Sequence, residues 1–267
     1  MTYIIPKGSS CWIRTIIGSS GCRQRLFAFP HAGGSASLFG SWAGLLPPSV
    51  QLCAIELPGR GARMAEPCRV STEPLVKDIV AALAPYLDLP FSFFGTSYGA
   101  LLAYDVARHL CFSGGPRPVK LFVAARQAPD LPERQPIHHL DEEDFIAALR
   151  SLGGIPSEIL DQDEVRSVFL PALRADFTAN ETYSFVEGPP LPCPISVFGG
   201  RCDSTTSEED LGAWRPHTRG AFRLRLLDGD HFFPFSDQGR PTLIAALAED
   251  LNAHPLGLGN ASAGAGR

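Results

Sequence analysis

A serine between two glycines, in the stretch FFGTSYGA at residues 93–100, is the feature that most limits how this chain can fold. It follows a hydrophobic run typical of a buried strand and precedes apolar residues at helical spacing. A strand and a helix joined this closely need a very sharp turn, in which Gly95 and Gly99 leave out side chains that would collide with neighbouring backbone. The turn would hold Ser97 in a strained conformation with its hydroxyl exposed at the carboxyl end of the strand. The alternative is an ordinary turn whose serine caps a helix.

The rest of the chain alternates short apolar runs with longer helical patterns. Strands are expected at residues 26–29, 51–55, 90–94, 119–124, 194–199 and 222–227, and helices at residues 72–87 and 98–112. This alternation predicts an α/β fold, in which helices cover both faces of a mostly parallel sheet. The order of the strands in the sheet stays open.

Residues 137–190 interrupt the alternation, because they carry no strand signal and are too long for an ordinary connection. Apolar residues at helical spacing predict two helices there, and Pro171 should kink or break the second. We expect this segment to form a helical lid over the carboxyl edge of the sheet. A helical pair packed on the flank for stability is the alternative. Within the segment, Arg174 and Asp176 are expected to form an ion pair or a cap.

Around this lid, residues 25–253 are expected to form one folded domain. Residues 1–24 would be an N-terminal extension, and the Gly/Ala-rich residues 254–267 a disordered tail. With 45% hydrophobic and 19% charged residues, a chain of 267 residues can bury a large core in one domain.

Charge and cysteine content argue against several classes of function. The formal net charge of −5 argues against nucleic acid as the main partner. No apolar run is long enough to span a membrane. Seven scattered cysteines without a CxxC pair favour free thiols in a reducing cytoplasm and argue against a structural zinc site.

A serine hydroxyl becomes a good nucleophile only when a base takes its proton. In this architecture an acid and a histidine follow later strands, in the order serine, acid, histidine. His231, within DGDHFF, follows the last expected strand, and Asp203, within GGRCDS, follows the strand before it. Asp130, after the strand at 119–124, is the alternative acid, whereas Asp230 is expected to make a hydrogen bond within its own loop.

Acyl chemistry also needs donors for the negative charge that forms on the substrate oxygen. The segment PHAGG follows the first expected strand, where a donor loop belongs. Backbone N–H groups of Ala32 and Tyr98 could therefore converge on this oxygen. The alternative for PHAGG is a simple turn that starts a helix at Ser35.

Five segments in this order, FPHAGGSASLF, LPGRG, FFGTSYGA, GGRCD and GDHFF, resemble the stand-alone type II thioesterases that accompany modular polyketide and nonribosomal peptide synthetases. LGGIPSEIL and FLPALRADFTANETY resemble the lid of that family, and the likeness runs from about residue 25 to about residue 251. The resemblance implies an α/β-hydrolase fold with Ser97, Asp203 and His231 as the catalytic triad. It also implies oxyanion donors at Ala32 and Tyr98, and no cofactor or metal.

The sequence departs from the family at three positions. Thr96 stands where the family usually has histidine, Tyr98 where it often has methionine or leucine, and Ser204 where proline commonly follows the acid. Thr96 and Tyr98 are expected to change the shape or polarity of the pocket beside the nucleophile. They affect the expected substrate preference and leave the expected reaction unchanged.

The activity that this resemblance implies is hydrolysis of acyl thioesters on the phosphopantetheine arms of acyl- or peptidyl-carrier domains. The expected compartment is the cytoplasm, no nucleic acid or membrane takes part, and the oligomeric state stays open, a monomer included. Carrier domains are generally acidic, so docking would need a basic patch. The arginines available for such a patch are Arg60, Arg63, Arg126, Arg134 and Arg174.

Other functions fit the same residues. One is a carboxylesterase or lipase that acts on small esters, and another is a non-catalytic module that holds an acylated partner. A macrocyclising release domain also fits, and an acid at Asp130 would favour it.

Overall fold

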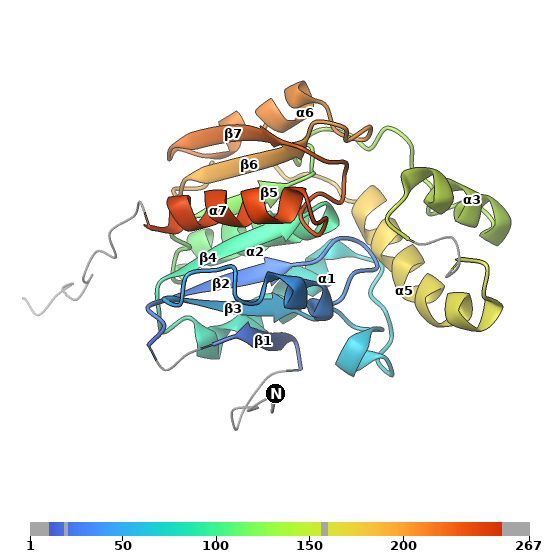
Figure 1. The fold of residues 1–267 in the computed structure, drawn as a ribbon, viewed down its shortest axis with the longest axis horizontal. Coiled ribbons are helices and arrows are strands. Elements are labelled where there is room, and N and C mark those ends of the chain that lie inside the picture. Colours follow the sequence, from blue (N-terminus) through green and yellow to red (C-terminus); the bar gives the residue numbers. More distant parts are fainter. Residues whose placement is uncertain (1–10, 19–20, 156–159, 253–267) are drawn as a thin grey trace, which may run out of the picture.

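A computed structural model describes residues 11–18, 21–155 and 160–252 of the chain. Seven strands in these ranges form one sheet in the order β1-β3-β2-β4-β5-β6-β7 (Figure 1). They are β1 (Ile13–Ile17), β2 (Gln24–Phe29), β3 (Val50–Ile55), β4 (Phe91–Thr96), β5 (Leu121–Ala124), β6 (Ile195–Gly200) and β7 (Phe222–Leu227). Only β1 is antiparallel to its neighbour, β3, so the expected mostly parallel sheet is confirmed.

The described helices connect these strands. They are α1 (Thr72–Leu83), α2 (Tyr98–Phe112), α3 (Glu142–Leu152), α5 (Asp163–Glu181), α6 (Glu208–Gly212) and α7 (Gly239–Asn252), with short 3-10 helices η1 (Ala36–Trp42), η2 (Gly61–Arg63), η3 (Ala84–Tyr86) and η4 (Arg215–His217). Every strand and helix expected in the alternating part of the chain is present. The strand β1 was not expected from the sequence. The tail at residues 254–267, expected to be disordered, lies outside the described residues.

Alternate side chains of the buried strands enter two hydrophobic clusters, one on each face of the sheet. Phe27 and Phe29 of β2 belong to the cluster covered by α1 and α2, whereas Leu26 and Ala28 belong to the cluster covered by α7 and η1. Figure 1 shows α7 in front of the sheet and α2 behind it. Helices therefore cover both faces, as the alternation predicts.

The segment that interrupts the alternation forms a helical unit from α3 and α5, which lie together on the right in Figure 1. The described part of residues 137–190 contains no strand, as expected. Asp141 caps α3 by accepting a hydrogen bond from the backbone N–H of Asp144. The helix α5 continues through Pro171, so the proline does not break it.

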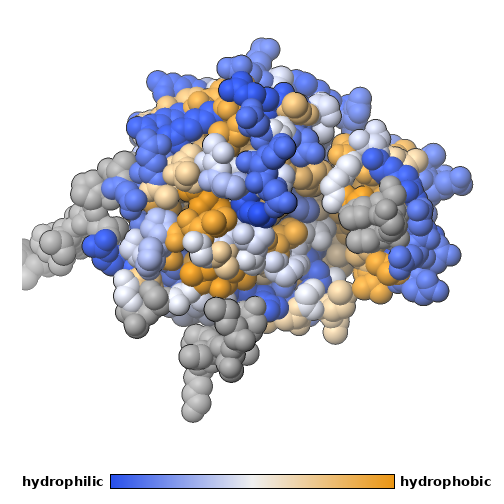
Figure 2. Space-filling view, viewed as in Figure 1, coloured by the Kyte–Doolittle hydropathy of each residue, from blue (hydrophilic) through white to orange (hydrophobic). Residues whose placement is uncertain are grey.

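The lid has a small hydrophobic cluster of its own. Phe145 and Leu149 of α3 pack with Leu170 and Leu173 of α5. The outer edge of this unit, on the right of Figure 2, is mostly hydrophilic. Each helix therefore turns an apolar stripe inward, toward the other helix and the sheet edge. None of the helices in the described ranges is long and apolar enough to cross a bilayer.

Candidate active site

Ser97 lies in the sharp turn between β4 and α2, as the sequence predicts. Its φ of 53° and ψ of −125° are seldom adopted by residues other than glycine. A Cβ atom on Gly95 would lie 2.3 Å from the carbonyl oxygen of Gly99, and a Cβ atom on Gly99 would lie 2.3 Å from that of Phe29. Within the described structure the Ser97 side chain makes no capping bond to α2. The strained turn is therefore confirmed, and the helix-capping alternative is wrong.

Asp203 and His231 meet because the loops after β6 and β7 are held together. The backbone N–H of Cys202 donates to the carbonyl of Gly229 at 2.9 Å. Gly200 permits this approach, since a Cβ atom there would lie 2.4 Å from the carbonyl oxygen of the residue before His231. Across the two loops, His231 Nδ1 lies 2.9 Å from Asp203 Oδ2.

The Asp203 side chain is fully buried and accepts several hydrogen bonds. Thr205 donates to Oδ1 through its backbone N–H at 2.8 Å and its hydroxyl at 2.7 Å, and the hydroxyl of Thr206 donates to Oδ2 at 2.8 Å. Burial alone would raise the pKa of Asp203, but the hydrogen bonds from His231 and Thr205 outweigh burial and lower the pKa to about 2. The carboxylate therefore stays ionised at neutral pH and can stabilise an imidazolium.

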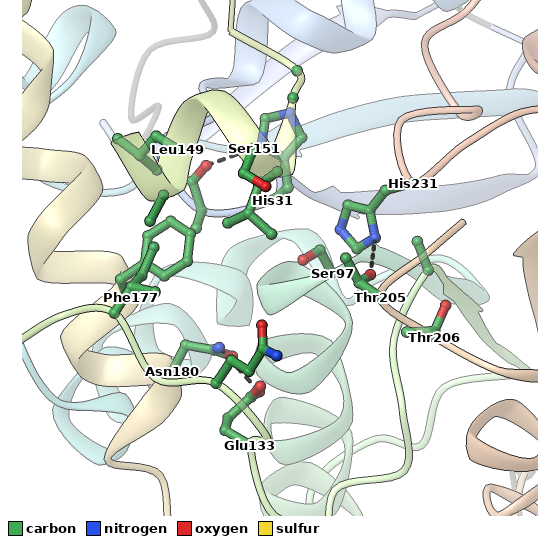
Figure 3. Close-up of a pocket in the computed structure, with 18 of the residues that line it drawn as sticks. His31, Ser97, Glu133, Leu149, Ser151, Phe177, Asn180, Thr205, Thr206 and His231 are labelled. Atoms are coloured by element: carbon green, nitrogen blue, oxygen red, sulfur yellow. Dashed lines mark hydrogen bonds between the residues drawn. The ribbon is translucent and has the colours of Figure 1, made fainter. Parts of the chain in front are cut away.

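Thr205 is a site residue that the sequence analysis missed. Its hydroxyl oxygen lies 2.8 Å from His231 Nδ1, the contact drawn as a dashed line in Figure 3. Because the hydroxyl proton is donated to Asp203, the oxygen accepts from Nδ1–H. The other ring nitrogen, Nε2, is then free to take a proton, and in Figure 3 it is on the side of the ring where Ser97 lies. A hydroxyl residue close behind the candidate acid was the only available signal.

Ser97 and His231 border one cavity of about 540 Å³, a usual size for a ligand pocket (Figure 3). The lid supplies Leu149, Leu173 and Phe177 to its wall. The helices α3 and α5 therefore cover the serine, and the alternative of a helical pair on the flank is wrong.

The two expected oxyanion donors come from different loops, and only Tyr98 is next to the nucleophile in the chain. Ala32 lines the cavity. Tyr98 is the first residue of α2, and a backbone N–H at this position has no acceptor within its helix. In the loop of Ala32, His31 Nδ1 lies 3.0 Å from the carbonyl oxygen of Ala32. Burial lowers the pKa of His31 more than this contact raises it, so His31 is neutral at neutral pH.

The lid helix α5 contacts the loop of Ala32 through a buried ion pair. Asp176 accepts two hydrogen bonds from the guanidinium of Arg60, and its Oδ1 lies 2.8 Å from Arg60 Nη2. Asp176 Oδ2 also accepts from the backbone N–H of Gly33 at 2.7 Å. The expected pair between Arg174 and Asp176 is therefore wrong. One carboxylate holds the lid, the LPGRG loop and the candidate oxyanion loop together.

Arg174 has a different role within the lid. Its Nη1 donates to the carbonyl oxygens of His138 at 2.9 Å and Leu140 at 2.6 Å. These bonds connect α5 to the segment that leads into α3. Carbonyl acceptors leave no sequence signal, which is why the partner of Arg174 could not be predicted.

Of the five arginines named as available for a basic docking patch, three are not on the surface. Arg60, Arg63 and Arg126 are buried, with exposed fractions of 6%, 4% and 7%. Of the other two, Arg174 is bonded within the lid, and Arg134 is exposed and paired with Asp210. The buried three are therefore not available to such a patch. Each pairs with a carboxylate of this chain: Arg60 with Asp176, Arg63 with Glu66 and Arg126 with Glu133.

Asp130, the alternative acid, contacts a different histidine. Its Oδ1 lies 2.8 Å from His217 Nε2, and the other nitrogen of His217 lies 3.1 Å from the hydroxyl of Tyr104. Asp230 accepts a hydrogen bond from the backbone N–H of Phe232 at 2.8 Å, so its expected bond within the loop is confirmed.

Neither Thr96 nor Tyr98 lines the cavity with its side chain, which contradicts the expectation that they shape the pocket. Both are buried, and the Tyr98 hydroxyl lies 3.4 Å from the hydroxyl of Thr72. Burial raises the pKa of Tyr98 well above its usual range, so the phenol stays neutral. The tyrosine ring fills the core under the turn.

No group of metal-ligating side chains occurs in the described ranges.

Comparison with known proteins identifies the family. A thioesterase-domain family model matches residues 24–251. Linear gramicidin dehydrogenase LgrE of Brevibacillus parabrevis is 36% identical over 260 residues, which cover 96% of this chain and 97% of that protein. Thioesterase PikA5 of Streptomyces venezuelae is 40% identical over 249 residues, which cover 93% of this chain and 86% of that protein.

Solved structures agree with these relatives. YbtT, a type II thioesterase from the yersiniabactin NRPS/PKS biosynthetic pathway, has a TM-score of 0.83 and 29% identity, and covers 91% of this chain and 99% of its own. The word dehydrogenase belongs to LgrE alone among these proteins, and the present sequence has no GxGxxG pattern of the kind that binds a dinucleotide. Since the family match extends over nearly the whole chain, this protein belongs to the thioesterase family of α/β-hydrolase enzymes and is related to the type II thioesterases of NRPS/PKS pathways.

Proposed function

We propose that this enzyme hydrolyses acyl thioesters from the phosphopantetheine arms of acyl- or peptidyl-carrier domains, in a polyketide or nonribosomal peptide pathway in the cytoplasm. The observation that carries this proposal is the hydrogen-bonded pair of Asp203 and His231 on the same cavity as the strained Ser97. A relative named as a type II thioesterase of such a pathway supports the substrate class.

In the first half of the reaction, Ser97 Oγ attacks the thioester carbonyl while His231 Nε2 takes its proton. Asp203, ionised because its pKa is about 2, stabilises the imidazolium. Backbone N–H groups of Ala32 and Tyr98 hold the oxyanion. The carbon–sulfur bond then breaks, and the proton on Nε2 passes to the leaving thiolate.

In the second half, a water molecule replaces the thiol. His231 Nε2 takes a proton from this water, and the hydroxide attacks the acyl-serine carbonyl under the same oxyanion donors. The ester bond to Ser97 breaks, the serine regains its proton from His231, and the free acid leaves. The lid of α3 and α5 keeps the acyl group in the cavity between the two halves.

The direct test uses carrier proteins loaded with a panel of short acyl groups, treated with wild type or the Ser97→Ala variant. Removal of the nucleophile should lower the hydrolysis rate by a factor of about a thousand or more. Equal release by both proteins would contradict the mechanism. A fluorophosphonate probe should label the wild type and leave the variant unlabelled, whereas an unlabelled wild type would favour the non-catalytic binding module.

A second measurement separates the thioesterase from a carboxylesterase or lipase. Each acyl group is offered as a carrier thioester and as a simple ester, and kcat/KM is compared. We expect the carrier thioester to be preferred for every acyl group. A consistent preference for the free ester would instead assign the same triad to an esterase.

A further inference from the structure

Two strained residues lie side by side at the edge of the sheet. Within the described ranges, the residues other than glycine with a positive φ are Ser97 at 53° and Ala125 at 49°. They follow the neighbouring parallel strands β4 and β5, in which Thr96 pairs with Ala124, and both line the cavity. Strain of this kind persists where the surrounding structure holds it, and it clusters at functional sites. The proposed mechanism accounts for Ser97 and gives no role to Ala125.

The strained backbone at Ala125 delivers the next side chain, Arg126, to the cavity. The backbone N–H of Ala125 donates to the carbonyl of Phe198 at 2.9 Å, and the carbonyl of Arg126 accepts from Trp214 Nε1 at 2.8 Å. These bonds fix the main chain on both sides of the turn. Arg126 is only 7% exposed and lines the cavity. A buried arginine at a substrate cavity needs an explanation, because burying a charge is costly.

Glu133 supplies part of that explanation. Its Oε1 accepts a hydrogen bond from Arg126 Nη1 at 2.6 Å. The loop between them is held by Gln127, whose side-chain amide donates to the carbonyls of Leu131 and Pro132, each at 3.1 Å. The pair is therefore assembled by its own loop before any ligand binds.

Asn180, near the end of α5, joins the same group. Its Nδ2 donates to Glu133 Oε1 at 3.2 Å, as the dashed line in Figure 3 shows. Because a carboxylate oxygen only accepts, this bond fixes which way the amide points. Arg126, Glu133 and Asn180, here called the polar wall, all line the cavity, together with the apolar lid residues.

Two buried atoms of the polar wall lack a hydrogen-bond partner in the described part of the chain. They are Arg126 Nε, a donor, and Asn180 Oδ1, an acceptor. An unpaired buried polar group costs on the order of 1–3 kcal/mol. Neighbouring atoms enclose both of these atoms, so a ligand group pairs with them, and recovers part of this cost, only when the Arg126 and Asn180 side chains turn toward the cavity. A plain alkyl chain would leave both unpaired.

The charges of the polar wall narrow the kind of ligand group. Arg126 and Glu133 neutralise each other. A ligand carboxylate at this wall would therefore be repelled by Glu133, and a ligand ammonium group would be repelled by Arg126. A neutral group that both donates and accepts fits best. Hydroxyl groups and secondary amides have this property, whereas hydrocarbon does not.

We propose that the polar wall selects thioesters in which the part that fills the cavity carries a hydroxyl group or a secondary amide. This inference rests on the proposed thioesterase function. The group can come from the acyl chain or from the pantetheine arm, which contains secondary amides. In either case the Arg126 and Asn180 side chains turn toward the group, Arg126 Nε donates to its oxygen, and Asn180 Oδ1 accepts its hydrogen.

The test compares matched substrates on the intact enzyme. Octanoyl thioesters are set against hydroxyoctanoyl isomers and against a chain of equal length with an internal amide, each on pantetheine and on a simple alkanethiol. We expect kcat/KM to favour a polar acyl group, or the pantetheine thiol, by on the order of tenfold or more. The same preference should fall at least several-fold in Asn180→Leu and in Arg126→Lys, which keeps a cation for Glu133 and removes the Nε donor.

Thr178→Val is the matched control, because Thr178 lies on the same helix, bonds to the carbonyl of Arg174 and does not line the cavity. It should keep the wild-type preferences. If the variants lose the preference among acyl groups, the polar group that binds belongs to the acyl chain. If they lose the preference between the two thiols, it belongs to the pantetheine arm. Wild type that hydrolyses octanoyl thioesters with no preference, or preferences unchanged in both variants, would overturn the polar wall alone. A wild type inactive on every thioester would overturn the proposed function as well.

Discussion

At the scale of single residues, the proposed chemistry depends on which carboxylate holds His231. Asp203→Asn should lower kcat by a factor of about a thousand or more, because an amide cannot stabilise the imidazolium and can favour the wrong tautomer. Asp130→Asn should have a small effect, since Asp130 contacts His217 and not His231. Steady-state hydrolysis of an acyl-carrier thioester by the two variants gives the comparison. Severe loss in the Asp130 variant alone would reverse the assignment of the acid.

Thr205 positions the pair of Asp203 and His231 through its hydroxyl group. Replacement of its hydroxyl in Thr205→Val removes a donor to Asp203 and an acceptor for His231 Nδ1, and should lower kcat by about three- to thirtyfold with little change in KM. Thr205→Ser keeps the hydroxyl and should restore most of the rate. If the serine variant is as slow as the valine variant, the methyl group matters and the hydrogen bonds do not. Both variants should remain folded, which circular dichroism can check.

How far the site could be predicted differs from residue to residue. Ser97, Asp203 and His231 could be proposed from the sequence because each follows a readable strand, and strand ends meet at one edge of a parallel sheet. Thr205 and Asn180 could not, since a threonine in a loop and an asparagine on a helix occur in every protein. Their roles arise only when separate loops and helices come together.

At the scale of elements, the lid and the candidate oxyanion loop are joined by Asp176. Asp176→Asn leaves the buried guanidinium of Arg60 without its counter-charge, which should lower the free energy of unfolding by about 3 kcal/mol. Because Gly33 is bonded to the same carboxylate, kcat should fall more than KM changes. Urea unfolding and steady-state kinetics measure the two effects.

The control for this prediction is an ion pair on the surface. Asp78→Asn removes the partner of Arg69, and both of those side chains are more than a third exposed. Its cost should be within about 0.5 kcal/mol. A cost for Asp176→Asn no larger than this would mean that the lid does not depend on the buried pair.

The strands and helices themselves were largely predictable, and the exceptions have a physical reason. Strands such as β4, buried on both faces, are continuous apolar runs that the sequence shows plainly. The edge strand β1 is short, half-exposed and carries Arg14, so it gains its structure from antiparallel pairing with β3. Pairing between distant segments leaves no local pattern.

At the scale of the whole molecule, buried charges are satisfied by partners that are far apart in the chain. Arg60 and Asp176 are 116 residues apart, and Lys120 and Asp250 are 130 residues apart. A buried charge without a partner is very costly, so these pairs constrain how the lid and α7 dock on the sheet. None of the pairs could be predicted from composition or spacing, because each residue alone resembles a surface charge.

Asp105 of α2 is a partly buried carboxylate, and its Oδ1 lies 4.0 Å from Nη1 of Arg108. Its side chain is 18% exposed and accepts a hydrogen bond from the hydroxyl of Tyr183 at 3.1 Å. Burial raises the pKa of Asp105 to about 6, although the bond from Tyr183 lowers it in part. Because the folded-state pKa is raised above the unfolded value, the neutral carboxyl favours folding at acid pH. That contribution is lost as the pH rises from about 4 through about 6.

Asp105→Asn should therefore remove a penalty that the wild type carries at neutral pH. The neutral amide can still accept from Tyr183. The quantity to compare is the unfolding free energy of the variant minus that of the wild type, and this difference should be about 2 to 3 kcal/mol larger at pH 7 than at pH 4. Urea unfolding at a series of pH values measures this difference. Asp237→Asn, whose side chain is 96% exposed, should follow the wild-type pH profile as the control. A difference that stays constant from pH 4 to pH 7 would mean that Asp105 is ionised at little cost in the folded protein.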